Sequence, residues 1–323
     1  MKKIIGFFSI LVLLQTINAG DNKFIYMDDM NYQYLDYLIN SGQFSPHFVF
    51  QQPYKLKEFD AVDTNLMAGQ WRYLFGDKHI SFFAGMENSW FTSDNERLRL
   101  YQVNAGAHYC DDDLILGNRT TLDKKYKYDE TFPGDLSESE DWLYGRVNDA
   151  YMDLTLDRFN LFIGRMKKNW GPVNSYGLIL SSNPYNYDQV NFAYNTDFFR
   201  FSLIYARLED ANAGREFFGR DSSYAEYINV RKHITGHRVD VHFSDNFQIA
   251  LTEMAIYGGE DRDFELAYAN PMNFYYGIQR NQGKGMSGLW SLDLFYKPRP
   301  KLTLYGQFLI DDIIVNNDPE VKD

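Results

Sequence analysis

The sequence predicts an all-β protein, an antiparallel transmembrane β-barrel with a short helical segment before it. Three observations lead to this fold class. The chain begins with a secretory leader, aromatic residues make up 17% of it, with 25 Tyr and 26 Phe, and its mean hydropathy is still −0.45. After the leader no run of about eighteen apolar residues occurs, so no spanning helix is predicted. A barrel explains this combination, since it hides its apolar face by alternation and carries aromatic girdles.

The leader occupies residues 1–19. Lys2 and Lys3 precede an apolar run over 4–14, and Ile17-Asn18-Ala19 offers a small-residue cleavage site. The run is too short for a spanning helix, so we expect a signal peptide that is cleaved near Ala19, with a retained anchor as the alternative. No cysteine follows the run, which argues against a lipoprotein.

Residues 20–60 are predicted to form a periplasmic helical segment and a lead-in to the barrel. Apolar residues recur at helical spacing over 34–39, Asp28 or Asp29 can cap the start, and Ser41-Gly42 can end the helix. The simplest role for this short amphipathic helix is packing against the barrel.

Residues 61–323 are predicted to form the barrel itself, with about twelve or thirteen strands of a larger one. Apolar and polar residues alternate with a period of two in several segments, as they do in half-buried strands. The clearest of these segments are 100–109, 150–157, 238–243, 290–296 and 302–309.

The connections between these strands alternate between short and long. Short turns rich in Gly, Asp, Asn or Pro are expected at 75–78, 110–113, 157–160, 195–197, 244–246 and 297–300. Long connections are expected at 126–145, 167–189, 209–230 and 258–286. Short turns at one end and long loops at the other are typical of an outer-membrane barrel, whereas a soluble sandwich explains the alternation alone.

Strand parity adds two expectations. Bacterial barrels normally place both termini and the short turns in the periplasm, which requires one more strand before residue 61. We expect that strand within 44–52. The strand ending near Asp311 then reaches the cell surface, so the sequence predicts a barrel that is incomplete on its C-terminal side.

Charge and motifs exclude several functions. The formal net charge of −12 argues against nucleic acid, and the single Cys110 cannot form an internal disulfide. No H-E-x-x-H, G-x-S-x-G or phosphate-binding glycine motif occurs. We therefore predict no catalytic residue, no metal site and no cofactor, with a barrel-type surface enzyme as an alternative.

Aromatic and amide residues gather in two of the long connections, 167–189 and 270–282. Flat rings stack on the C–H faces of sugars, while amides and charged groups hydrogen-bond hydroxyls. The candidate carbohydrate-binding residues are Trp170, Tyr176, Asn183, Tyr185, Tyr187, Asn273, Tyr276 and Arg280. The competing interpretation is structural, because Tyr and Trp also line membrane interfaces and Asn occurs in turns.

Two patches resemble the capsule-assembly Wzi family of outer-membrane proteins. The first, "GRMKKNWGPVNSYGLILSSNP", supplies a Gly-Arg strand end, a Trp-Gly-Pro turn and a Leu-Ile-Leu-Ser-x-Asn segment. The second is the Tyr-x-Gln-Phe strand at 305–308, followed by Asp311 and Asp312. Val173 stands where the family usually has Gly. The residues that we assign to the structural motif are Gly164, Arg165, Gly171, Pro172, Ser181, Tyr305 and Gln307.

The resemblance implies a barrel of about eighteen strands in the bacterial outer membrane. It further implies a non-catalytic role, in which the protein binds, anchors or organises surface or capsular polysaccharide. Weak contacts from many copies would add up to firm anchoring. The expected partners are that polysaccharide and outer-membrane lipid, with no nucleic acid; a general porin or solute channel is the alternative.

Overall fold

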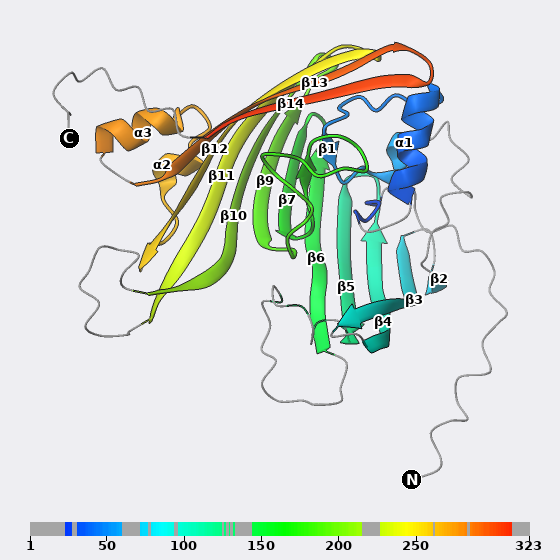
Figure 1. Ribbon diagram of the computed structural model, residues 1–323. Coiled ribbons are helices and arrows are strands. Elements are labelled where there is room, and N and C mark those ends of the chain that lie inside the picture. The colour runs from blue at the N-terminus through cyan, green and yellow to red at the C-terminus, as the bar shows by residue number, and fades with distance from the viewer. Residues whose placement is uncertain are drawn as a thin grey trace, which may run out of the picture.

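The computed structural model describes residues 23–27, 31–59, 72–76, 79–93, 96–124, 126, 129, 132, 144–214, 227–260, 262–282 and 285–311 (Figure 1). The expected signal peptide, its cleavage near Ala19, the capping Asp28 and Asp29, and the chain after Asp311 lie outside these residues. Strand parity beyond Asp311 therefore stays a prediction.

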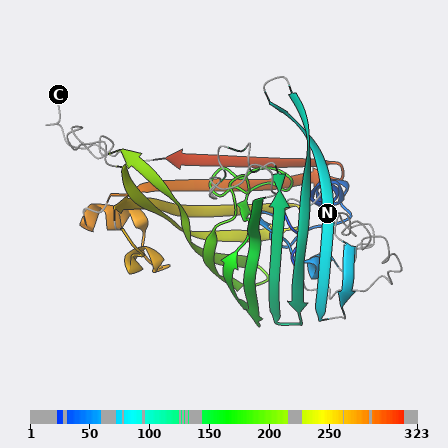
Figure 2. The ribbon, with the colours of Figure 1, turned by 90° about the horizontal axis from the view of Figure 1, so that it is seen from below.

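Most of the described chain forms one antiparallel sheet of twelve strands, in the order β14-β13-β12-β11-β10-β9-β7-β6-β5-β4-β3-β2. The strands are β2 (Arg72–Gly76), β3 (Ile80–Ser93), β4 (Glu96–Cys110), β5 (Leu114–Asp123), β6 (Tyr144–Leu156), β7 (Phe159–Arg165), β9 (Asp188–Asn195), β10 (Phe199–Gly214), β11 (Tyr227–Ser244), β12 (Phe247–Glu260), β13 (Ser287–Arg299) and β14 (Leu302–Asp311). Consecutive strands pair as hairpins, and the sheet curves strongly (Figures 1 and 2). Its two edge strands, β2 and β14, do not pair with each other within the described residues. The all-β antiparallel prediction is confirmed.

From β4 onward the connections follow the predicted alternation of short and long, whereas β3 and β4 are joined by a further short connection, between Ser93 and Glu96, that the sequence did not predict. Five of the six predicted short turns lie between paired strands close to the predicted positions, for example at Asp157-Arg158 between β6 and β7. Residues 77–78 of the sixth, predicted at 75–78, lie outside the described residues. The long connection predicted over 209–230 is wrong in its bounds, since β10 runs to Gly214 and β11 begins at Tyr227. The polar stretch that indicated a loop there belongs to strand ends, where β10 and β11 stay paired beyond an irregularity between Leu208 and Ala211.

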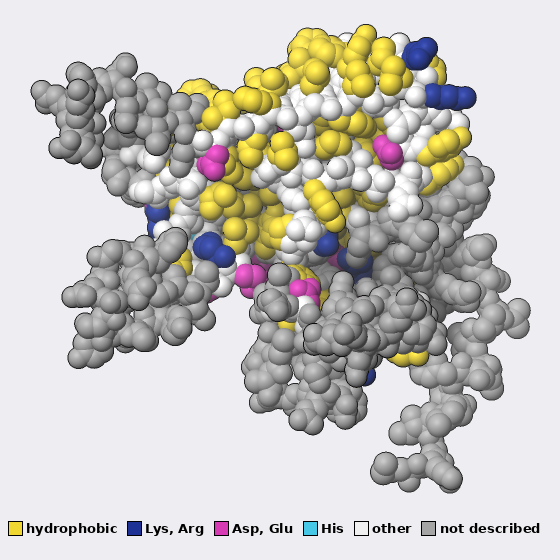
Figure 3. All heavy atoms as spheres, in the orientation of Figure 1, with side chains coloured by type: hydrophobic (Ala, Val, Ile, Leu, Met, Phe, Trp, Pro, Cys, Tyr) yellow, Lys and Arg dark blue, Asp and Glu magenta, His cyan; other side chains and the backbone are white. Residues whose placement is uncertain are grey.

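The apolar face of the sheet points outward. On β13 the side chains of Trp290, Leu292, Leu294 and Tyr296 are exposed, and those of Ser291, Asp293, Phe295 and Lys297 are buried. Hydrophobic side chains accordingly cover the top of the molecule over β13 and β14 (Figure 3). The burial is thus the reverse of that in a water-soluble sheet, which buries its apolar face.

The N-terminal segment fills the inner side of the sheet. It contains α1 (Asn31–Ser41), β1 (Gln51–Gln52) and a 3₁₀ turn, η1 (Leu56–Phe59). The helix buries Leu35, Leu38 and Ile39 in a cluster that includes Phe295 of β13. Its periodicity and its end at Ser41 were predicted correctly.

The additional sheet strand predicted within 44–52 is wrong. Only Gln51 and Gln52 form a strand, and it pairs with β8 (Asn169–Trp170) in a separate two-stranded sheet. The apolar residues that indicated a strand, Phe48, Val49 and Phe50, are instead buried against the inner face of the large sheet.

Two short helices, α2 (Leu266–Ala269) and α3 (Tyr275–Gln282), lie in the connection between β12 and β13. Their Tyr268 and Tyr275 are buried against β12, and the Thr235 hydroxyl donates to the Tyr268 carbonyl at 2.9 Å. No helix in the described part of the chain has both the length and the apolar character needed to cross a membrane.

Candidate functional site

The connection between β7 and β9 folds back onto the inner face of the sheet. Asn169 and Trp170 form β8, which pairs with β1, and the Trp170 N–H donates to the Leu180 carbonyl at 2.9 Å. The Trp170 side chain is 3% exposed and packs with Ile179, Leu180 and Tyr187. This segment is therefore a fixed part of the interior.

An amide pair holds the start of this segment. Asn169 Nδ2 donates to Gln52 Oε1 at 2.6 Å, and Gln52 Nε2 donates to the Gly171 carbonyl at 3.1 Å. Asn169 Oδ1 also accepts the Gly177 N–H at 2.7 Å. Both side chains are buried, so these bonds replace the water that their polar atoms would otherwise need.

Two positions of the predicted motif require glycine, because neighbouring backbone lies too close to leave room for a Cβ atom. A Cβ on Gly171 would lie 2.6 Å from the Gly177 Cα. Gly164 has φ +138°, and a Cβ there would lie 2.2 Å from the Ala150 carbonyl oxygen. Neither position accepts a side chain without backbone movement.

The remaining motif residues in this connection have local structural roles. Arg165 pairs with Asp188 across β7 and β9 at 2.7 Å, the Pro172 carbonyl accepts from Asn169 at 3.4 Å, and Ser181 Oγ accepts the Asn183 N–H at 3.0 Å. These contacts fix the shape of the connection.

The second motif patch meets the first one inside the molecule. Gln307 Nε2 on β14 donates to the Trp170 carbonyl at 3.3 Å, and Gln307 Oε1 accepts the Leu178 N–H at 3.3 Å. Tyr305, two residues earlier on the same strand, packs on the core that surrounds α1. The two patches therefore form a single structural unit, although they lie far apart in the sequence.

A buried charge network lies beneath that unit. Arg238 on β11 contacts Asp293 of β13 at 2.6 Å and Asp240 at 3.0 Å. Its Nη1 also donates to Thr252 Oγ1 at 3.0 Å, and its guanidinium lies 5.6 Å from the Trp170 ring centroid. We call this the Arg238 network. It links β11, β12 and β13 to the connection between β7 and β9, which we call the inserted segment.

The sugar-binding candidates of this connection separate by exposure. Trp170 and Tyr187 are only 3% and 7% exposed, whereas Tyr176 is 63% exposed and Asn183 is exposed. Tyr185 is half-buried, with the Arg146 guanidinium 5.1 Å from its ring centroid and its hydroxyl donating to Asp129. Burial first, and then the Asp129 carboxylate, raise the pKa of Tyr185 well above its usual value.

The other three candidates lie in the connection between β12 and β13. Asn273 Nδ2 donates to the Ala267 carbonyl at 3.0 Å, and the half-buried Tyr276, the second residue of α3, donates its N–H to Glu253 Oε1 at 3.4 Å. Arg280 lies in α3, and its side chain is outside the described part of the structure. No hydrogen bond between described side chains joins this group to Tyr176 or Asn183.

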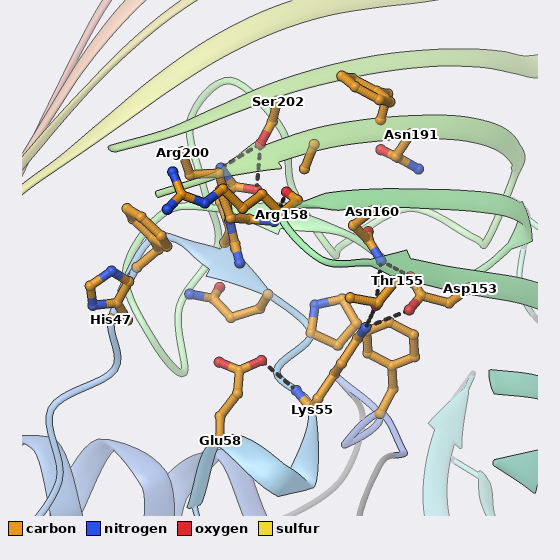
Figure 4. Close-up of a pocket in the computed structure, with 18 of the residues that line it drawn as sticks. His47, Lys55, Glu58, Asp153, Thr155, Arg158, Asn160, Asn191, Arg200 and Ser202 are labelled. Atoms are coloured by element: carbon orange, nitrogen blue, oxygen red, sulfur yellow. Dashed lines mark hydrogen bonds and ion pairs between the residues drawn. The ribbon is translucent and has the colours of Figure 1, made fainter. Parts of the chain in front are cut away.

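The structure also contains a cavity that the sequence does not predict. It has a volume of about 510 Å³ and lies between the N-terminal segment and β6, β7, β9 and β10 (Figure 4). Lys55 crosses it and contacts Asp153 at 2.5 Å and Thr155 at 3.1 Å. Because these residues come from several distant segments, no sequence motif marks them.

Among the described residues, no three His, Cys, Asp or Glu side chains lie in an arrangement that could hold a metal ion. His233 bonds to the Tyr205 hydroxyl at 2.8 Å, and His237 lies 2.9 Å from Glu253.

The sheet, its outward apolar side chains and its filled inner face together define an antiparallel all-β protein. Residues 88–315 match the family model of the capsule assembly protein Wzi, and the chain belongs to that family. The resemblance inferred from the two sequence patches is thereby confirmed. A comparison with curated proteins gave no match. A solved porin structure, refined at 1.8 Å, is similar with a TM-score of 0.40 and 12% identity, over 76% of each chain.

Proposed function

We propose that this protein is a non-catalytic outer-membrane β-barrel that binds, anchors or organises surface polysaccharide. Membership of the Wzi capsule assembly family is the observation that carries this proposal. The secretory leader predicted over 1–19 and the antiparallel sheet support the location.

The outward apolar face supports membrane placement. Leu292, Leu294 and Phe308 are 42%, 38% and 61% exposed on neighbouring strands, and exposing such a surface to water is unfavourable. Each buried CH₂ contributes about 0.8 kcal/mol, so lipid contact along many strands would stabilise the sheet greatly. Outer-membrane lipid is the partner that fits this surface.

Polysaccharide contact is assigned to the exposed part of the connection between β7 and β9. Tyr176 presents an open ring, Asn183 presents an amide, and Tyr185 offers a half-buried ring nearby in sequence. A ring of this kind can stack on a sugar, while the amide can donate to and accept from hydroxyls. Asn273, Tyr276 and Arg280 remain candidates, whereas the buried Trp170 and Tyr187 support the segment from within.

A solute channel is less well supported. The N-terminal segment and the inserted segment occupy the inner face, where Phe50, Leu35 and Trp170 are buried. Measurable ion conductance in planar bilayers, together with unchanged polymer retention in a deletion strain, would favour the channel instead.

Deletion of the gene tests the proposal. We expect polymer to move from the cell surface into the medium while total polymer stays constant. Complementation with a Tyr176→Ala, Asn183→Ala double variant should restore at most about half of the retention, because weak contacts act through multivalency. Tyr37→Ala is a matched control, since Tyr37 is 58% exposed but lies on α1, and it should restore retention fully. Unchanged cell-bound polymer in the deletion strain would refute the role.

A further inference from the structure

The cavity described above lies at the short-turn end of the sheet. Its walls include Asp157 and Arg158 from the turn between β6 and β7, and Thr196 and Asp197 from the turn between β9 and β10. The N-terminal segment closes the opposite side through residues 47–58 (Figure 4). A volume of about 510 Å³ is within the range of small-molecule sites.

The lining is richer in positive charge than the chain as a whole. Five lining residues are Lys or Arg and four are Asp or Glu, although the protein carries a formal net charge of −12. The carboxylate of Asp153 is already engaged by Lys55 at 2.5 Å and by Asn160 Nδ2 at 2.9 Å. Asp153, whose side chain is 1% exposed, is thus already neutralised by Lys55.

Two of the cations have no such partner. Lys168 Nζ lies 4.3 Å from the Phe162 ring centroid and 5.6 Å from that of Phe24, and no described carboxylate forms an ion pair with it. Arg200 donates to the neutral Asn195 Oδ1 at 2.5 Å and lies 4.7 Å from the Phe48 ring centroid, again without an ion pair among the described residues. Both side chains are partly shielded from water. A shielded cation without a counter-ion is costly to maintain, so an anion from outside would be favoured here.

Electrostatics within the cavity agree with this geometry. Burial lowers the pKa of Lys168 to about 8, while Asp153 opposes the shift and Lys55 and Arg200 add to it. Lys168 and Arg200 therefore repel each other across the cavity. A bound anion would relieve that repulsion.

The uncharged part of the lining is suited to a sugar. Amides and hydroxyls are supplied by Gln51, Asn160, Asn191, Asn195, Thr155 and Ser202. Aromatic rings are supplied by Phe24, Phe48, Phe192 and Trp170. Amides satisfy sugar hydroxyls and rings pack on sugar C–H groups, which a simple inorganic anion does not require.

We propose that this cavity binds a small anionic sugar, with its acidic group held by Lys168 and Arg200 and its hydroxyls by the surrounding amides. The inference does not rest on the polymer-anchoring role, because the cavity shares no residue with Tyr176, Asn183 or Tyr185. Failure of one proposal therefore leaves the other standing.

Titration of the full-length protein in detergent micelles tests the inference, with Trp170 fluorescence and calorimetry as readouts. We expect glucuronate or glucose 6-phosphate to bind at least ten-fold more tightly than glucose or inorganic phosphate. The two anionic sugars distinguish a carboxylate from a phosphate ligand. Equal binding of glucose would overturn the role of charge, and equal binding of inorganic phosphate would overturn the role of the sugar.

Substitutions test whether Lys168 and Arg200 hold the acidic group of the ligand. Lys168→Met and Arg200→Gln should each weaken binding at least ten-fold, and Lys168→Arg should retain most of it. Arg207→Gln is the matched control, because Arg207 is an exposed cation on the same strand as Arg200 and does not line the cavity. Undiminished binding in folded Lys168→Met protein would refute the site. If that variant does not fold, the four-ligand comparison on the unsubstituted protein still decides.

Discussion

The Arg238 network and the cavity around Lys168 lie against the same inserted segment, but they differ in whether their cations have carboxylate partners. In the network the guanidinium of Arg238 meets two carboxylates, Asp240 and Asp293, and is itself fully buried. In the cavity Lys168 and Arg200 meet aromatic rings and a neutral amide. Internally matched charge indicates a structural role, whereas unmatched charge next to open space indicates a ligand.

The largest expected effect comes from breaking the matched side. Asp293→Ala should lower the free energy of unfolding by about 3 kcal/mol, because it leaves Arg238 with one carboxylate and removes an acceptor from Gln307. Urea unfolding in micelles would measure this loss.

Asp210→Ala provides the control for that experiment. Asp210 pairs with Arg207 at 3.2 Å on a partly exposed part of β10, where an ion pair contributes less than about 1 kcal/mol. Equal effects of the two substitutions would show that burial does not distinguish these ion pairs.

The next effect has the opposite sign. Lys168→Met should raise the free energy of unfolding by about 1–2 kcal/mol at pH 7, because an apolar side chain replaces a desolvated charge. This figure is reduced to allow for the intermediate exposure of the lysine. The same variant should lose affinity for the anionic sugar. Destabilisation by Lys168→Met in the absence of ligand would indicate that the lysine is structural.

The smallest effect is the dependence of that stability gain on pH. The folded pKa of Lys168 is lowered to about 8, below its ordinary value of 10.5, so the unfolded chain holds this proton over a range where the folded chain has released it. The stability of the unsubstituted protein should therefore rise across this range relative to Lys168→Met. The advantage of the variant should be full below about pH 8 and vanish near about 10.5. A pH-independent difference in unfolding free energy between the two proteins would contradict the lowered pKa of Lys168. Burial is the main cause of that shift, and Asp153, Lys55 and Arg200 modify it.

Local patterns were sufficient to predict much of the fold. Period-two alternation and short turns depend on neighbouring residues, so the strands and their hairpins follow from the sequence. The strand predicted within 44–52 is wrong because an apolar stretch such as Phe48-Val49-Phe50 has the same pattern in a strand and in a segment that packs inside the sheet. Which one forms is decided by the distant strands against which it packs.

The candidate site was predicted less well, for the same reason. The Trp-Gly-Pro motif identified the family, but burial of Trp170 depends on Gln307 and Arg238, which are distant in sequence. Lys168 immediately precedes the buried Asn169 and gave no signal of its own. Its significance depends on Arg200, Phe162 and the N-terminal segment, which meet only in the folded chain.

The docking of α1 has a consequence for the order of folding. The helix lies against Phe295, and the Lys301 N–H between β13 and β14 donates to the Asn40 carbonyl at 2.6 Å. Almost the whole described chain separates these partners. The helix can meet Val49, Phe50 and Tyr54 early, but it gains its contacts with Phe295 and Lys301 only after the last described hairpin exists. Contacts of such long range are slow to form. We therefore expect the N-terminal segment to reach its final position last, as the step that completes assembly of the interior.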